Sequence, residues 1–132
     1  MLLGIGPGPD GTLPPEAIVR LQEIGKWLNK NGSAIYNTRT IAHYQEGNVF
    51  FTRSKKGDRM YALVCLPESK PVSGTISWTE NLPAKGTKLI LLETGQAIPY
   101  AIKQNTVMIT LPASKVNSPA LVFSFQPQTP AK

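Results

Sequence analysis

The glycines of residues 6–11 stand at a spacing that can bind a dinucleotide, G-x-G-x-x-G, between a short apolar run and a helical pattern. In such a turn, free backbone N–H groups at the first turn of the helix hold the pyrophosphate. Here two of the intervening positions are Pro7 and Pro9, which have no N–H to donate. We therefore interpret residues 4–17 as a proline-stiffened loop between a strand end and a helix, and not as a nucleotide site.

The acidic side chains are the candidates for hydrolytic chemistry, because a glycosidase needs two carboxylates about 5–9.5 Å apart. Five of them lie in or beside turns, where turn chemistry explains them: Glu46, Asp58, Glu68, Glu80 and Glu93. Glu16 and Glu23 belong to the helical pattern. No acid/base pair is indicated, so we predict no catalytic residue. Asp10 is the one acidic candidate for a sugar or interface contact, and the alternative is that Asp10 and Gly11 simply form a turn.

The chain has one cysteine and one histidine. This excludes an internal disulfide, a cysteine metal cluster and the usual Ser-His-Asp triad, and no His-based metal site can be completed. We predict that Cys65 is a small buried hydrophobe in a strand rather than a nucleophile, and that His43 is a surface residue. We accordingly predict no metal site and no cofactor.

Aromatic side chains supply the remaining candidates. Trp78, Tyr61 and Tyr100 could form a sugar-stacking platform, although strand alternation more often places such residues in a core. Trp27 lies near the edge of a helical apolar stripe, where it can lie across a neighbouring element. We therefore take Trp27 and Trp78, together with Asp10, as the candidates for sugar or interface contact.

The net charge of +6 is unevenly distributed along the 132 residues. Residues 1–38 hold three basic and three acidic residues, whereas residues 39–132 hold eleven basic and five acidic ones. The basic residues are scattered beside turns and form no strip interleaved with aromatics, so we predict no nucleic-acid partner; a weak contact with a polyanion or acidic partner is the alternative. No apolar run approaches the roughly 20 residues that span a bilayer, and we predict no membrane partner. The localisation of the chain is undetermined.

Hydrophobic periodicity divides the chain into two unlike parts. From Pro14 to Asn31 the apolar residues recur at helical spacing and form one stripe: Ala17, Ile18, Leu21, Ile24 and Leu28. After about residue 40 the period becomes two, which predicts strands at 49–53, 59–66, 74–79, 87–92, 97–102, 107–111 and 120–125. We predict a mainly β protein, an antiparallel β-sandwich of about seven to eight strands preceded by a single α-helix.

Residues 2–39 closely resemble a segment near the C-terminal end of the α-L-fucosidases of glycoside hydrolase family 29. The ordered matches are Ile5-Gly6-Pro7, Asp10-Gly11, Pro14-Pro15, Ile24-Gly25, Trp27-Leu28, Asn31-Gly32, Ala34-Ile35-Tyr36 and Thr38-Arg39. Gly4 departs from the pattern, since the family usually has Asn there. The β part resembles the end of the same family more loosely, at residues 49–62, 89–95 and 107–112.

The resemblance implies two regions. Residues 1–38 would be the end of a catalytic barrel (last strand, proline-glycine loop and closing helix), and residues 39–132 a C-terminal β-sandwich domain. The complete enzymes hydrolyse terminal α-L-fucosyl linkages with retention, without a metal or organic cofactor, and are periplasmic, secreted or lysosomal. Their catalytic Asp and Glu lie on the barrel, upstream of Met1. We therefore expect this chain alone to be inactive, although its family is one of glycosidases, and to support the barrel structurally.

Two further expectations concern partners. The apolar face of residues 1–31 would be covered either by the missing barrel or by self-association as a dimer. The alternative function is a free-standing carbohydrate-binding or protein-interaction module, for which fucosylated glycans are the expected ligands.

Overall fold

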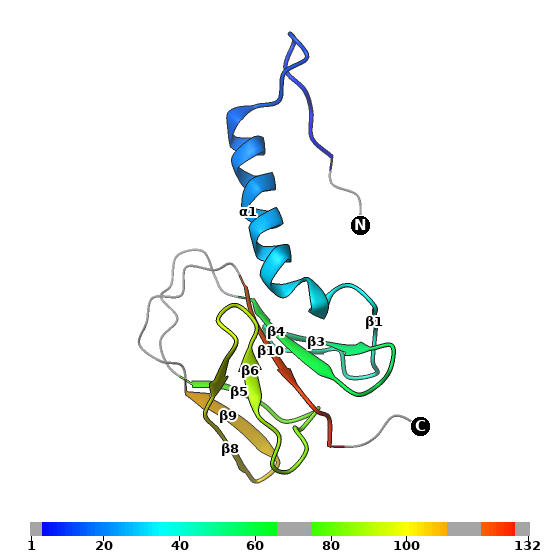
Figure 1. The fold of residues 1–132 in the computed structure, drawn as a ribbon, viewed down its shortest axis with the longest axis vertical. Helices are drawn as coiled ribbons and strands as arrows, with labels where there is room; N and C mark the ends of the chain where they lie inside the picture. The colour runs from blue at the N-terminus through cyan, green and yellow to red at the C-terminus, as the bar shows by residue number, and fades with distance from the viewer. Residues whose placement is uncertain (1–3, 66–74, 111–119, 129–132) are drawn as a thin grey trace.

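The computed structural model describes residues 4–65, 75–110 and 120–128. In these residues it shows a mainly β protein whose one α-helix precedes the strands in the chain and stands above them in Figure 1. The helix α1 spans Pro15–Asn31 and continues into a 3₁₀ turn, η1, at Gly32–Ala34. Proline occupies the first turn of α1, where its missing N–H costs nothing. The predicted helix is confirmed with almost the same bounds.

The larger sheet holds seven strands in the order β1-β3-β4-β10-β6-β7, with β2 also paired to β3. Their bounds are Thr38–Arg39 for β1, Gln45–Glu46 for β2, Val49–Ser54 for β3, Met60–Cys65 for β4, Leu89–Leu91 for β6, Gln96–Ile98 for β7 and Ala120–Phe125 for β10. The smaller sheet has the order β5-β9-β8, with β5 at Thr75–Trp78, β8 at Tyr100–Lys103 and β9 at Thr106–Thr110. Every pairing between these strands is antiparallel, as the short turn-separated segments predict.

The ten strands of the described residues exceed the predicted seven to eight for two physical reasons. The strands β1 and β2 have two residues each, too few for a period to be visible. The segment 97–102 is two strands, because Pro99 has no N–H for a ladder and the chain changes sheets there. Before it, Ile98 pairs with Leu89 in the larger sheet; after it, Tyr100 pairs with Ile109 in the smaller one.

The main core lies between the two sheets and contains inward-facing residues of both. Trp78 is at its centre, with its ring 5.6 Å from that of Phe51 in an edge-on arrangement and 6.0 Å from that of Phe125 in a stacked one. These three aromatic side chains come from β5, β3 and β10, so they join the smaller sheet to the larger. Aromatic pairs of this geometry add stabilisation beyond their burial.

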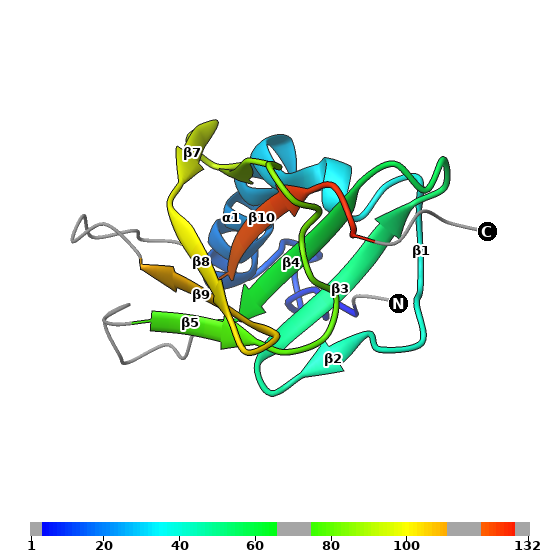
Figure 2. The ribbon, with the colours of Figure 1, turned by 90° about the horizontal axis from the view of Figure 1, so that it is seen from below.

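A second, smaller cluster lies on the opposite face of the larger sheet, under the C-terminal end of α1. Tyr61 and Val122 of the sheet pack with Ala34 of η1, and Trp27 packs against them. The Thr52 hydroxyl donates to the Ala34 carbonyl at 2.7 Å, which ties β3 to η1. In Figure 2, α1 lies on one side of β4 and β10, and the strands β5, β8 and β9 lie on the other.

One prediction about this part of the fold is wrong, and another falls partly outside the described residues. Cys65 is exposed at the end of β4, because the alternation that buries Val64 turns the next side chain outward. The expected strand at residues 1–5 lies mostly outside the described residues, and Gly4 and Ile5 are not in a strand. Glu68, which we expect in or beside a turn, also lies outside the described residues. In the described part, no helix is long and apolar enough to cross a membrane.

Candidate functional site

The carboxylate of Asp10 is engaged within its own loop. Its Oδ1 accepts hydrogen bonds from the Thr12 hydroxyl at 2.7 Å and from the Thr12 backbone N–H at 3.2 Å. The hydroxyl bond, and after it the backbone bond, lower the pKa of Asp10 below its ordinary value. Gly11 follows with a φ of +82°, a conformation that glycine adopts without strain. These contacts are those of an Asp-Gly turn. This is the alternative to a sugar or interface contact that the sequence left open for Asp10.

The three rings considered as a sugar platform are each engaged with other parts of the chain. Trp78 is 1% exposed, and its indole N–H donates to the Asn81 carbonyl at 3.2 Å. Tyr61 is buried beneath η1, and the Tyr100 hydroxyl donates to the Thr87 carbonyl at 2.6 Å. The rings therefore form no exposed platform on which a sugar could stack.

Trp27 contacts a neighbouring element of its own chain. Its indole N–H donates to the carbonyl of Ala120, the first residue of β10, at 2.9 Å. The Asn31 amide donates to the Trp27 carbonyl at 3.1 Å, one turn further along the helix. The Lys30 ammonium lies 4.0 Å from a carboxylate oxygen of Glu93, in the turn between β6 and β7. The contacts of Trp27 with Ala120 and of Lys30 with Glu93 fix the C-terminal end of α1 to the larger sheet.

Three other described carboxylates, those of Glu23, Glu46 and Asp58, also take part in local structure. Glu23 pairs with Arg20 on the exposed surface of α1, and Asp58 accepts a hydrogen bond from Ser54 across the β3–β4 turn. Glu46 accepts hydrogen bonds from residues that follow β5. Among the described residues, no three His, Cys, Asp or Glu side chains gather as they would to hold a metal ion.

The apolar stripe of α1 is exposed over much of its length in the part of the chain that the structure describes. Ile18, Leu21 and Ile24 are 41%, 37% and 40% exposed, whereas Ala17 and Leu28 are half-buried. Figure 1 shows why: only the C-terminal end of α1 reaches the sheets, and its N-terminal half projects away from them. Scattered apolar side chains on a surface are ordinary, but a continuous stripe marks an interface.

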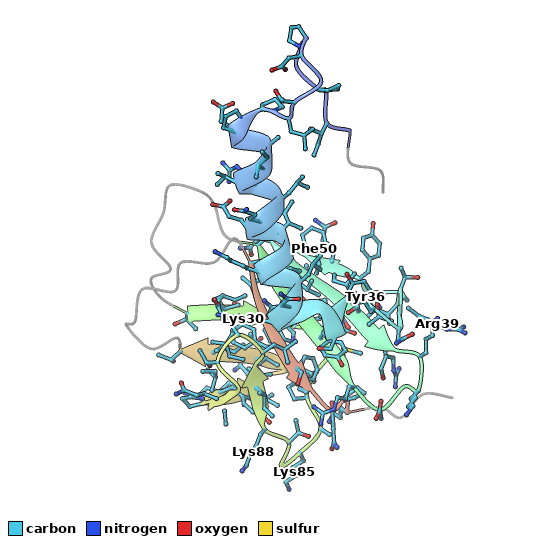
Figure 3. All side chains as sticks on the ribbon, turned by 45° about the horizontal axis from the view of Figure 1, so that its top comes forward. Lys30, Tyr36, Arg39, Phe50, Lys85 and Lys88 are labelled. Atoms are coloured by element: carbon cyan, nitrogen blue, oxygen red, sulfur yellow. The ribbon has the colours of Figure 1, made fainter. Side chains whose placement is uncertain are left out.

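The stripe continues onto the larger sheet. Phe50 of β3 and Leu63 of β4 stand directly opposite each other on the sheet face that α1 covers, and both are only half-buried. Leu63 packs against the cluster that holds Trp27, and Phe50 is labelled on β3 in Figure 3. We call this surface the apolar corner: the helix positions Ala17, Ile18, Leu21, Ile24 and Leu28 with Phe50 and Leu63.

Sequence reasoning identified the helix stripe but missed the sheet side of the apolar corner. The available signal was the run Val49-Phe50-Phe51 in β3, where every position is apolar. A strand with one solvent-exposed face alternates apolar and polar residues, so consecutive apolar residues indicate a strand that is covered on both faces. Val49 and Phe51 enter the core, and Phe50 faces the corner.

Comparisons with known proteins agree on one family. A family model described as alpha-L-fucosidase matches residues 1–33. The human plasma alpha-L-fucosidase is 32% identical over 117 residues, which cover 85% of this chain and 24% of that protein. An alpha-L-fucosidase of Branchiostoma floridae is 32% identical over 123 residues, covering 89% of this chain and 26% of that protein. The chain thus spans about a quarter of the length of these curated relatives.

Solved structures extend the likeness to the fold. The Thermotoga maritima alpha-fucosidase, solved with a mechanism-based inhibitor, matches with a TM-score of 0.71 and 26% identity over 95% of this chain and 30% of its own. A Bacteroides thetaiotaomicron GH29 alpha-L-fucosidase, trapped as a covalent intermediate, matches with a TM-score of 0.70 and 25% identity over 96% of this chain and 28% of its own. Sequence and fold together show that this chain belongs to the α-L-fucosidase family, glycoside hydrolase family 29, as a C-terminal portion of it.

Proposed function

We propose that the chain is a non-catalytic part of an α-L-fucosidase-like glycoside hydrolase, and that its role is to support the catalytic barrel. The complete enzyme would hydrolyse terminal α-L-fucosyl linkages with retention, using carboxylates that this chain does not supply. In this proposal, residues 1–38 complete the barrel end and residues 39–132 form the β-sandwich domain that braces it.

The observation that carries the proposal is the apolar corner. Full burial of a Leu or Ile side chain stabilises a protein by about 1.5–3 kcal/mol, so a side chain that is two-fifths exposed leaves roughly 1 kcal/mol unused. Ile18, Leu21 and Ile24 together leave an amount that matters against a total domain stability of about 5–15 kcal/mol. A barrel wall packed against this face would recover that stabilisation, and so the corner would hold the sandwich in a fixed place on the barrel.

The engagement of the carboxylates supports the non-catalytic part of the proposal. Asp10 and Asp58 each accept a hydrogen bond from a hydroxyl group within their own turn, and Glu46 is used between elements. A glycosidase acid needs a raised pKa, whereas hydrogen bonds hold the pKa values of these three residues below their ordinary values. The lowered pKa values disfavour the general-acid role for these three residues, and their hydrogen bonds give each of them a structural use.

A chimeric enzyme tests the supporting role. The C-terminal segment that matches this chain in the Thermotoga maritima enzyme would be replaced by this chain. We expect a soluble, active chimera whose melting temperature falls by several degrees with Leu21→Glu, since that substitution places a charge in the apolar corner. Val19→Glu is the matched control, because Val19 is 52% exposed and lies on the opposite side of α1. Equal melting temperatures for the two variants would contradict the proposal.

The alternative, a free-standing carbohydrate-binding module, predicts a different result. Titration of the chain with fucose or a fucosylated oligosaccharide would then change the tryptophan fluorescence, most directly through the half-buried Trp27. We expect no saturable change, because the Trp78 ring is enclosed in the core and the Trp27 indole N–H is already bonded to the Ala120 carbonyl. A saturable change that is lost in Trp27→Phe would favour the binding module.

A further inference from the structure

Basic residues that are scattered along the sequence meet at one end of the larger sheet. In the antiparallel register, Phe125 at the end of β10 pairs with Met60 at the start of β4. The strand β3 ends beside them, and β6 begins on the other side of β10. The turn 54–59, which joins β3 to β4, and the connection 84–88, which leads into β6, therefore lie at the same end of the sheet.

Hydrogen bonds hold these two segments in place. The Ser54 N–H donates to the Arg59 carbonyl at 2.9 Å and closes the β3–β4 turn. On the other side of β10, the Ala84 N–H donates to the Gln126 carbonyl at 2.8 Å. The Thr87 hydroxyl donates to the side-chain oxygen of Gln126 at 3.2 Å. Both segments are thus fixed to the ends of their neighbouring strands.

The two segments carry almost only positive charge. Residues 53–59 and 84–88 contain six basic residues and one acidic residue, in a chain whose net charge is +6. Figure 3 shows Lys85 and Lys88 projecting from the end of the β body that lies away from α1. Five of the six basic side chains are exposed, and we call them the basic rim: Lys55, Lys56, Arg59, Lys85 and Lys88.

The one acidic residue of these segments is used within its own turn. The Asp58 carboxylate accepts a hydrogen bond from the Ser54 hydroxyl at 2.7 Å. That bond is the main cause of the lowered pKa of Asp58, and the positive charges of Lys56 and Arg59 lower it further. Three other described carboxylates lie towards the opposite end of the larger sheet: Glu46, Glu80 and Glu93. The basic rim is therefore a local excess of positive charge, which attracts anions.

The basic rim is separate from the apolar corner. Trp27 of α1 binds the carbonyl of Ala120 at the start of β10, whereas the rim lies at the end of that strand. A strand of this length separates its two ends by about 17 Å. The free half of α1 projects beyond the other end of the sheet (Figure 1). The surface that the proposed function assigns to the barrel therefore does not include the rim.

The shape of the basic rim fits an extended chain that carries several negative charges. From β3 across β4 and β10 to β6 there are three strand spacings, about 14 Å in all. That row is too long for one carboxylate or one sulfate group. Lysine, which supplies four of the five cations, is a point charge on a flexible stem and attracts anionic groups without fixed geometry. Single-stranded nucleic acid needs aromatic rings on which bases stack, and residues 53–59 and 84–88 contain none.

We propose that the basic rim binds the sulfate or carboxylate groups of an anionic glycan, and thereby holds an acidic fucosylated glycan on the enzyme. The choice of a glycan as the polyanion rests on the proposed function, because a glycosidase meets its substrate as part of a sugar chain. The attraction acts between exposed charges, so salt weakens it. The rim binds the chain of the substrate and takes no part in the cleavage of the fucosyl linkage.

Fluorescence polarisation with a labelled heparin octasaccharide, a sulfated glycan, tests the binding to the 132-residue chain. We expect saturable binding at about 50 mM salt that weakens as the salt concentration rises. The same octasaccharide after desulfation should bind about tenfold more weakly, because it carries fewer charges. Polyglutamate and a single-stranded oligonucleotide with the same number of charges test the other polyanions. Tighter binding of either one than of the sulfated octasaccharide would overturn the choice of a glycan.

Paired substitutions locate the binding surface. Lys55→Gln with Lys56→Gln and, separately, Lys85→Gln with Lys88→Gln should each weaken binding about five- to tenfold. Arg20→Gln with Lys26→Gln is the matched control, since it removes two exposed positive charges from α1. The control should change binding less than about twofold. Equal losses in all three proteins would show that only the net charge matters and would overturn the rim, as would no saturable binding by the wild-type chain. Far-UV circular dichroism identifies a variant that has lost its fold, and the other rim pair then serves in its place.

The chimeric enzyme separates this proposal from the proposed function. A rim pair substituted in the chimera should raise KM for a sulfated fucosyl oligosaccharide and leave KM for a neutral aryl α-L-fucoside unchanged. An unchanged KM for both substrates would overturn the role of the rim in holding substrate, while dependence of the chimera on Leu21 would still support the proposed function. If the isolated chain binds through the rim but the chimera does not depend on Leu21, the proposed function fails and the rim remains an anionic-glycan surface.

Discussion

The carboxylate of Glu46 connects the two sheets, and replacing it should destabilise the sandwich measurably. Glu46 ends β2 at the edge of the larger sheet, and Thr79 and Glu80 directly follow β5 of the smaller one. Both carboxylate oxygens of Glu46 accept from the Thr79 N–H at 2.9 Å, and one accepts from the Thr79 hydroxyl at 3.0 Å. The Glu80 N–H donates to the other at 3.2 Å.

The magnitude follows from what Glu46→Gln removes. An amide has one accepting oxygen, and its NH₂ group would face N–H donors where the carboxylate had an acceptor. Hydrogen bonds to a charged group contribute about 1.5–3 kcal/mol, but these donors are near the surface and water can replace part of the loss, so we expect a net cost of about 1–2 kcal/mol. Glu80→Gln is the control, since it removes an equal charge from the segment that Glu46 binds and keeps the backbone N–H that donates to Glu46.

The pH dependence gives a second readout. Partial burial acts to raise the pKa of Glu46, but the hydrogen bonds from Thr79 and Glu80 outweigh it and hold the pKa below its ordinary value of 4.5. A carboxyl whose pKa is lower in the folded state stabilises the fold above its unfolded pKa and loses that contribution as the pH falls. The stability difference between wild type and Glu46→Gln should therefore shrink below pH 4.5.

Urea unfolding at pH 7 and at several values between pH 5 and 3 measures both effects. The Asp10 and Asp58 carboxyls also have lowered pKa values, but they are present in both proteins and cancel in the difference. The reasoning is refuted if Glu46→Gln and Glu80→Gln unfold at the same urea concentration at pH 7. It is equally refuted if the difference between wild type and Glu46→Gln is the same at pH 7 and pH 3.

Three further substitutions test other parts of the structure by urea unfolding. Trp27→Phe removes the hydrogen bond to the Ala120 carbonyl and should cost about 0.5–1.5 kcal/mol; an unchanged midpoint would show that this bond does not hold α1 to the sheet. Trp78→Ala should cost about 3–5 kcal/mol because it empties the centre of the core, and a loss below 1 kcal/mol would disprove that placement. Gly95→Ala should cost about 1–2 kcal/mol, since a non-glycine residue is strained at its φ of +73°; a stabilised variant would contradict that backbone conformation.

Most of the fold could be predicted from local sequence patterns. The stripe from Ala17 to Leu28 and the proline-rich start define α1, because a helix can be recognised from the period of its apolar residues and from the residues that begin and end it. The long strands likewise follow from alternation and turn residues. The change of sheet at Pro99 was not predicted, because alternation continues through the proline and only the pairing partners reveal the break.

The candidate site was predicted less well, because it depends on contacts between distant residues. Nothing local to Glu46 indicates that its partners lie 33 and 34 positions away. The sequence identifies the Trp78 ring as apolar but not which side of β5 faces the core. The stripe on α1 was visible, but its exposure and its continuation onto Phe50 depend on how the helix meets the sheet.

The assay of the purified chain with an aryl α-L-fucoside tests the central claim most directly. The chain would be prepared from a host that lacks glycosidases of its own and assayed at high enzyme concentration beside an active α-L-fucosidase. A non-catalytic part of the family predicts release of the aryl group no faster than in buffer. Turnover above buffer that is lost in Asp10→Asn would contradict the claim, because it would place a working carboxylate in this chain.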